Sequence, residues 1–187
     1  MKQTDLKKIV LTSFFIALGY VFTIPFRGVF IGIIPLGSFF SPMHLPVFIC
    51  GLLIGWKYGL IAGLVTPLLV SIFGGMPPLL PSGVVMSAEM GTYGLVSGLF
   101  YHRLVLIKHP TVHIYVALVG AMLLGRIVYL VVMGIVLTFG TYGAYNLISY
   151  LKTLFIIAIP GIIIQLIFVP IIVRTIQKRL FLFQGNE

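Results

Sequence analysis

Residues 114–138 read IYVALVGAMLLGRIVYLVVMGIVLT, an apolar stretch interrupted by a single charge at Arg126. A helix needs roughly 20 residues to cross the hydrocarbon core of a bilayer, so this stretch is long enough to span it. A charged side chain at bilayer depth costs roughly 3 kcal/mol or more and usually faces a substrate, ion or proton pathway. The stretch therefore predicts a membrane helix, and Arg126 is its candidate functional residue.

The composition of the whole chain is that of an integral membrane protein. Its 187 residues are 60% hydrophobic and 8% charged, whereas soluble domains are about 45–50% apolar and about 25% charged. At roughly 20 residues per helix, the length accommodates about six spans with short loops and leaves no room for a soluble ATPase or enzymatic domain. We expect an all-α bundle of six transmembrane helices that forms a single membrane domain, residues 1–187.

Six apolar segments can be assigned as spans, separated by Gly- and Pro-rich or charged connections. They cover about residues 6–26, 44–55, 59–73, 84–100, 112–137 and 153–173. The second and third segments are too short to cross upright, and a re-entrant or strongly tilted pair is the alternative. Pro160 is expected to kink the last span, and Pro170 to bend its final turns.

The distribution of basic residues predicts the orientation, because cytoplasmic connections carry an excess of Lys and Arg. With both termini in the cytoplasm, the outer side holds only Arg27 and Lys152. The inner side then holds Lys2, Lys7, Lys8, Lys57, Arg103, Lys108, Arg174, Lys178 and Arg179. This dispersal along the helix ends also argues against nucleic acid as a partner, despite a net charge of +9. The outer connections, about residues 27–42, 74–83 and 138–152, are apolar and are expected to act as lids.

Two opposite charges are predicted to share one layer of the membrane. At about 1.5 Å per residue, Arg126 lies about 21 Å above the inner end of its span, and Glu89 about 8 Å below the outer end of its own. Both positions fall in the outer half of a core about 30 Å thick. One interpretation is a structural ion pair. The other is a polar pocket in which Arg126 binds an anion, since its planar fork suits carboxylate or phosphate.

Four further residues are candidates for the same pocket. Tyr129 shares a helix face with Arg126, and Tyr93 shares one with Glu89, because residues three or four apart are neighbours on a helix. Both are interpreted either as ligand walls or as core aromatics. Asn146, in the last outer connection, can donate and accept hydrogen bonds. His44 is expected at the outer mouth, more as an interfacial residue than as a ligand contact.

No enzymatic constellation is found in the sequence. His, Cys, Asp and Glu are not clustered at metal-ligand spacing, no carboxylate pair is available, and no phosphate-binding loop is present. We therefore predict no catalytic residue, metal or cofactor. A small membrane-embedded enzyme acting on lipid or prenyl phosphate stays open as an alternative, as does a standalone channel.

Small residues four apart recur along the chain and allow helices to approach closely. Most of these pairs are interpreted as internal packing; they are Gly51/Gly55, Gly59/Gly63 and Gly94/Gly98. Ser13 and Ala17 in the first span are the exception, because they form a smooth strip suited to a partner membrane protein.

Several stretches resemble the substrate-binding S components of energy-coupling factor (ECF) vitamin transporters, most closely the pantothenate-type branch. The resemblance covers the chain by length and layout, and its clearest stretches are Met43–Val47, Gly51–Gly55, Lys57–Gly59, Gly74–Leu79 and Gly125–Tyr129. It implies a multi-pass protein of the bacterial cell membrane that binds a vitamin in the outer half of the lipid bilayer. It also implies that Ser13 and Ala17 meet a transmembrane coupling protein, whose two cytoplasmic ATPases use the ATP. Delivery would occur by toppling within the membrane.

Pantothenate is the favoured ligand. Its carboxylate suits Arg126, and its amide and hydroxyls suit Glu89, Asn146 and the tyrosines. The alternatives are a pyridoxine- or hydroxymethylpyrimidine-type ligand, for which the tyrosines would form flat walls, and riboflavin or folate.

Overall fold

A computed structural model describes residues 3–28, 42–75, 77–103, 109–139 and 158–184. Every regular element in these ranges is helical, which confirms the predicted all-α class for this part of the chain. The helices are α1 (Gln3–Gly28), α3 (His44–Ile54), α4 (Trp56–Gly74), the π-helical turn η1 (Leu79–Gly83), α5 (Val84–Arg103), α6 (Pro110–Phe139) and α8 (Ile159–Gln184).

Four of the described helices are long and apolar enough to cross a membrane. The crossing segments are Asp5–Pro25 of α1, Trp56–Gly74 of α4, Thr111–Phe139 of α6 and Ile159–Lys178 of α8. Helix α5 has 20 residues but carries more polar side chains, and α3 has only 11 residues. At about 1.5 Å per residue, α3 reaches about half-way through a bilayer core. The chain is therefore a multi-pass membrane protein, and six complete crossings remain a prediction.

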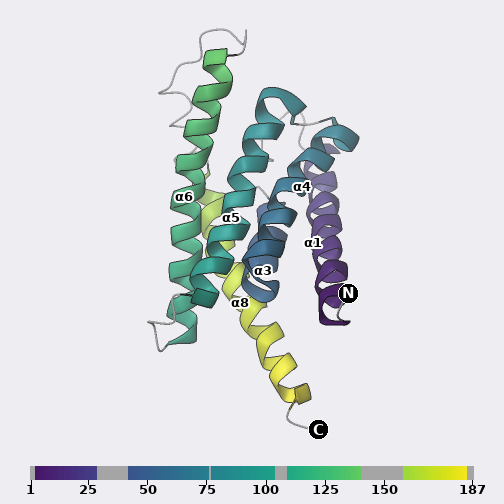
Figure 1. Ribbon diagram of the computed structural model, residues 1–187, viewed down its shortest axis with the longest axis vertical. Helices are drawn as coiled ribbons and strands as arrows, with labels where there is room; N and C mark the ends of the chain where they lie inside the picture. Colours follow the sequence, from purple (N-terminus) through teal and green to yellow (C-terminus); the bar gives the residue numbers. More distant parts are fainter. Residues whose placement is uncertain (1–2, 29–41, 76, 104–108, 140–157, 185–187) are drawn as a thin grey trace.

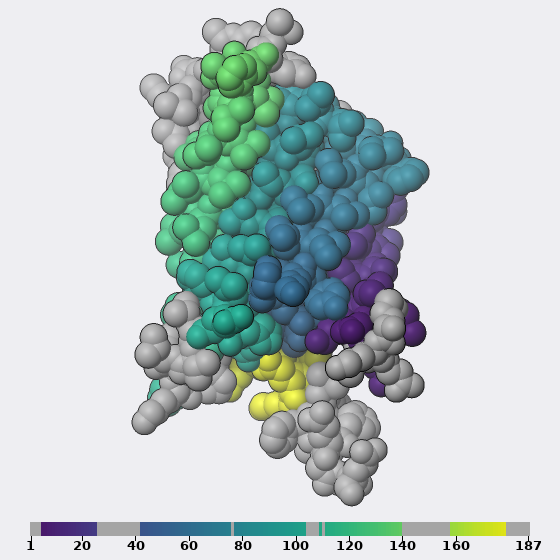
Figure 2. All heavy atoms as spheres, viewed as in Figure 1, coloured from purple at the N-terminus to yellow at the C-terminus, as the bar shows by residue number. Residues whose placement is uncertain are grey.

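Helix α5 occupies the centre of the bundle. It packs against α3, α4 and α6, while α1 lies on α3 and α4, and α8 lies on α3 and α6 (Figure 1). Helix α1 begins and α8 ends toward the same end of the bundle (Figure 1). On the face seen in Figure 2, the side chains of α4, α5 and α6 close against one another. Residues carried by α5 are therefore enclosed on several sides.

Glycines allow α5 to approach its neighbours closely. A Cβ added to Gly59 or Gly94 would strike the backbone of the other helix, and one added to Gly63 would strike that of Met90. These contacts confirm the predicted internal packing for this part of the bundle. Gly55 is an exception, because it has no atom near its missing Cβ and instead adopts φ 121° between α3 and α4. That left-handed conformation favours glycine where the chain turns from one helix into the next.

The outward faces of the helices are apolar. Such a continuous apolar surface would be unstable in water but is suited to lipid. Examples from three helices are Val10, Phe14, Leu123, Ile127, Val131, Ile163 and Ile167, all exposed.

Aromatic and polar contacts join three helices at the C-terminal end of α5. The rings of Tyr101 and His113 stack with centroids 5.0 Å apart, and Nε2 of His113 lies 3.0 Å from the carbonyl oxygen of Phe100. Gln177 of α8 donates a hydrogen bond of 2.9 Å to the hydroxyl of Tyr101. These contacts tie α5, α6 and α8 together.

Two predicted boundaries differ from the structure. Helix α4 begins at Trp56 rather than near residue 59, because the interfacial aromatic segment forms its first turn. Helix α8 begins at Ile159 and continues past residue 173 to Gln184. Pro160 consequently lies in the first turn of the described helix, where a missing N–H is tolerated, and the predicted kink of the longer span stays a prediction. Residues 153–157, which were predicted to belong to the same span, lie outside the described ranges.

Candidate functional site

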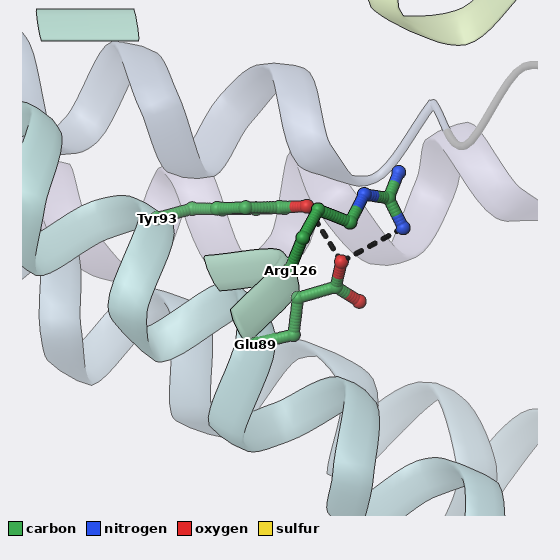
Figure 3. A network of polar contacts seen from close by, with 3 residues as sticks. All are labelled: Glu89, Tyr93 and Arg126. Carbon is green, nitrogen blue, oxygen red and sulfur yellow. Dashed lines mark hydrogen bonds and ion pairs between the residues drawn. The ribbon is translucent and has the colours of Figure 1, made fainter. Parts of the chain in front are cut away.

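An ion pair joins α5 and α6 inside the bundle. Nη1 of Arg126 lies 3.0 Å from Oε1 of Glu89, as Figure 3 shows. The side chain of Glu89 is 3% exposed and that of Arg126 is 17% exposed. The pairing confirms that the two charges share a layer, as their heights along the helices predicted. It also gives each buried charge an opposite partner, without which either would be strongly destabilising.

Tyr93 completes the group, and we refer to Glu89, Tyr93 and Arg126 as the polar layer. The hydroxyl of Tyr93 donates a hydrogen bond of 2.5 Å to the same Oε1 that contacts Arg126. Both α5 residues therefore share a face, as their spacing predicted. In Figure 3 the other carboxylate oxygen of Glu89 and the other terminal nitrogen of Arg126 point away from this contact. Since a guanidinium carries five N–H donors, Arg126 keeps donor capacity beyond its bond to Glu89.

Packing on two sides holds the ring of Tyr93 in place. The ring is 1% exposed and stacks on Phe48 of α3, with centroids 5.0 Å apart and planes 24° apart. On the α6 side, a Cβ added to Gly125 would overlap the ring of Tyr93. The absence of a side chain at Gly125 thus lets α6 approach the ring and brings Arg126 next to Glu89.

His44 is buried rather than interfacial. It is the first residue of α3, its side chain is 4% exposed, and its ring centroid lies 5.5 Å from that of Tyr93. The expectation of an interfacial residue at an open mouth is therefore wrong. The physical reason is the short length of α3, whose first turn lies beside Tyr93 inside the bundle.

Of the two remaining predicted pocket residues, Tyr129 and Asn146, only the first lies within the described ranges. Tyr129 is half-buried on α6, one turn beyond Arg126. Asn146 lies outside the described residues. Phe48 and Gly125 were not among the predicted site residues. The position of Phe48 four residues after His44 was an available signal, as was the small Gly125 directly before a membrane arginine.

Ser13 and Ala17 lie on a different surface of the bundle. Both are exposed on α1, and they line an apolar groove between α1 and α4 with a volume of about 560 Å³. Ser13 donates its hydroxyl hydrogen bond to the carbonyl oxygen of Ile9, 3.1 Å away. We call this surface the α1–α4 groove; it is lined by Ser13, Ile16, Ala17, Tyr20, Val21, Val65, Leu69 and Phe73.

The polar layer offers groups that can recognise a ligand. It combines directed N–H donors, a carboxylate acceptor and an aromatic wall, which together suit a small polar ligand. Across the described part of the chain, no three His, Cys, Asp or Glu residues lie close enough together to hold a metal ion.

Comparison with protein families identifies the family of the chain. The family model "ECF transporter, substrate-specific component" matches residues 7–176. No match is found among curated proteins or among solved structures. The family match extends over all the described helices except the ends of α1 and α8, and therefore includes both the polar layer and the α1–α4 groove. The chain thus belongs to the substrate-specific components of ECF transporters, membrane subunits that bind a small molecule and couple to the ECF module.

Proposed function

We propose that this substrate-specific subunit captures a water-soluble vitamin, with pantothenate favoured, in the outer half of the bilayer. The observation that carries the proposal is the half-buried Arg126, which is paired with Glu89 at 3.0 Å and retains a terminal nitrogen that points away from it (Figure 3). A guanidinium can bind a carboxylate through two parallel hydrogen bonds. Arg126 is therefore the proposed anchor for the carboxylate of the ligand.

The rest of the proposed ligand contacts follow from their chemistry. Tyr93 and His44 lie together beside the charged pair, and Tyr129 lies farther along α6. Pantothenate presents an amide and hydroxyls in addition to its carboxylate, so it requires several neutral donors and acceptors around Arg126. Asn146 is proposed to supply an amide from the outer connection.

The α1–α4 groove is the proposed docking surface for the transmembrane coupling protein. Ser13 and Ala17 are exposed there, and their small side chains would let a partner helix approach closely. Transport would then proceed by toppling of this subunit, driven by ATP hydrolysis in two partner ATPases. The chain itself is proposed to need no cofactor.

Both termini are proposed to face the cytoplasm of a bacterial cell. The excess of Lys and Arg on one side supports this orientation. The common end at which α1 begins and α8 ends (Figure 1) is compatible with it.

The proposal is tested by two measurements on the purified protein. The first identifies by native mass spectrometry the small molecule that copurifies with the chain. The second measures pantothenate binding by calorimetry, where Arg126→Ala is expected to weaken binding by about 2–5 kcal/mol. The double variant Glu89→Gln/Arg126→Gln is a control, because it removes the anchor without leaving an unpaired buried charge.

Three outcomes would change the proposed ligand, the proposed anchor residue or the proposed transport role. Copurification of a different vitamin would replace pantothenate but retain the transport role. Unchanged pantothenate affinity in a folded Arg126→Ala variant would remove Arg126 from the site. Substrate flux into liposomes by this chain alone, without coupling protein or ATP, would instead indicate a channel.

A further inference from the structure

We infer that Glu89 sets the charge class of the ligand: a ligand carboxylate replaces Glu89 on Arg126, and Glu89 takes up one proton. This inference rests on the proposed function, because it assigns a role to the partner of the proposed anchor. It concerns Glu89 because this acid lies in the interior of a helix, whereas Asp5 lies in the first turn of α1 and Glu187 lies outside the described residues.

With Glu89 and Arg126 both ionised, the polar layer is electrically neutral before a ligand arrives. Arg126 and Glu89 form a 3.0 Å pair with side chains 17% and 3% exposed, so water contributes little screening at this depth. Among the described residues, the other titratable groups near this pair are Tyr93 on α5, which donates to Glu89, His44 on α3, which contacts Tyr93, and Tyr129, one turn beyond Arg126 on α6. Lys57 and Tyr58 occupy the first turn of α4, and η1 contains no titratable side chain.

A carboxylate ligand disturbs this neutrality. If Glu89 remained ionised, two carboxylates would share one guanidinium and the buried layer would carry a net negative charge. Two carboxylates that share a site do not readily remain ionised together, and one of them takes a proton. In the proposed exchange, one ligand anion and one proton enter together, so the net charge of the layer stays at zero.

The contacts of Glu89 suit the protonated form. A neutral carboxyl group has one O–H donor and still accepts hydrogen bonds. Oε1 would continue to accept the hydrogen bond from Tyr93, while the other oxygen, which points away from Arg126 in Figure 3, would carry the proton. Glu89 would then donate this hydrogen to the ligand, and Tyr93 would hold the carboxyl group in position.

Neutral ligands are expected to behave differently. They can accept hydrogen bonds from Arg126 while the pair with Glu89 remains intact, so no proton is required. Linked uptake of one proton predicts that the Kd of a carboxylate ligand rises up to tenfold per pH unit, whereas the Kd of a neutral ligand stays constant.

The experiment compares pantothenate with pantothenol, in which an uncharged alcohol replaces the carboxylate. Binding to the full chain in nanodiscs is measured by calorimetry between pH 6 and 8, in PIPES and in imidazole, neither of which carries a carboxylate or phosphate group. These buffers differ in ionisation enthalpy, so the difference between the binding heats measured in the two buffers gives the number of protons taken up per ligand. We expect about one proton per pantothenate and none per pantothenol, with a pantothenate Kd about 100-fold weaker at pH 8 than at pH 6.

Two variants sharpen the measurement. Glu89→Gln is expected to abolish proton uptake and to make pantothenate binding independent of pH. Asp5→Asn is the matched acid-to-amide control, and it should retain both effects. The proton count of the unmodified protein carries the test even where Glu89→Gln fails to fold.

The inference and the proposed function fail in different ways. Pantothenate binding with no proton uptake and equal Kd at pH 6 and pH 8 would overturn the inference and leave the vitamin-binding role in place. Proton uptake that persists in a folded Glu89→Gln variant would also overturn it, since another group would be titrating. If the folded protein bound no vitamin at either pH, the proposed function itself would be lost, and the inference with it.

Discussion

The polar layer and the α1–α4 groove, which are the proposed ligand site and the proposed docking surface, differ in chemistry and in exposure. In the polar layer, the buried Glu89 contacts both the buried Tyr93 and the half-buried Arg126, so directed hydrogen bonds are proposed to select the ligand. The groove is open and apolar, and the hydroxyl of Ser13 bonds to its own helix. A partner there would be selected by shape and close packing. If the two proposed roles hold, one small bundle separates selection of the ligand from docking of the partner.

The two regions also differ in what they contribute to stability. Removal of one member of the polar layer leaves another without its partner inside the bundle, where water cannot replace it. The small groove residues Ser13 and Ala17 are exposed. Substitutions in the polar layer should therefore lower the free energy of unfolding, whereas substitutions in the groove should leave it nearly unchanged.

The largest effect is expected for Arg126→Ala. It leaves the carboxylate of Glu89 buried without a countercharge, which costs about 3–5 kcal/mol. The free energy of unfolding, measured by denaturant titration in mixed micelles, should fall by that amount. The double variant Glu89→Gln/Arg126→Gln should recover much of the loss. A single variant as stable as the unmodified protein would contradict the view that the pair is isolated from water.

Tyr93→Phe should have the next largest effect. The ring keeps its stacking on Phe48, but Glu89 loses a charge-assisted hydrogen bond worth about 1.5–3 kcal/mol. Tyr101→Phe is the matched control, because it removes only a neutral hydrogen bond with Gln177, worth about 0.5–1.5 kcal/mol. Equal losses of unfolding free energy in the two variants would indicate that the Tyr93 bond gains nothing from the charge on Glu89.

Gly125→Ala tests the close approach of α6 to the polar layer. The added methyl group would overlap the ring of Tyr93, and overpacking of this kind costs about 1–3 kcal/mol. Gly134→Ala on the same helix is the control, since its added Cβ meets no atom within 4 Å and alanine favours the helix by about 1 kcal/mol. Melting temperatures that move in the same direction for both variants would contradict the proposed packing role of Gly125.

The smallest effect on stability is expected in the groove. Ser13→Leu and Ala17→Leu should change the unfolding free energy by no more than about 0.5 kcal/mol and leave vitamin binding unchanged. Transport by the subunit reconstituted with its coupling protein and ATPases should fall at least tenfold. Val10→Leu is the control, because Val10 is exposed on α1 but does not line the groove. Normal transport by both groove variants would exclude this surface as the docking site.

Much of the candidate site could be predicted from the sequence because helix geometry is regular. The rise per residue placed Glu89 and Arg126 in one layer, and the i, i+4 spacing placed Tyr93 beside Glu89. The burial of His44 could not be predicted in this way. It depends on where α3 begins relative to α5, and no periodicity within either helix specifies that relation.

The sequence by itself determined the membrane class, the helical segments and the shared depth of the two charges. Each of these follows from local hydropathy and from the constant rise of a helix. Only the tertiary structure decided that Phe48 and Gly125 hold Tyr93, and that one oxygen of Glu89 serves both Tyr93 and Arg126. These contacts join α3, α5 and α6, and they depend on how each helix is rotated and packed against the others, which is a property of the assembled bundle.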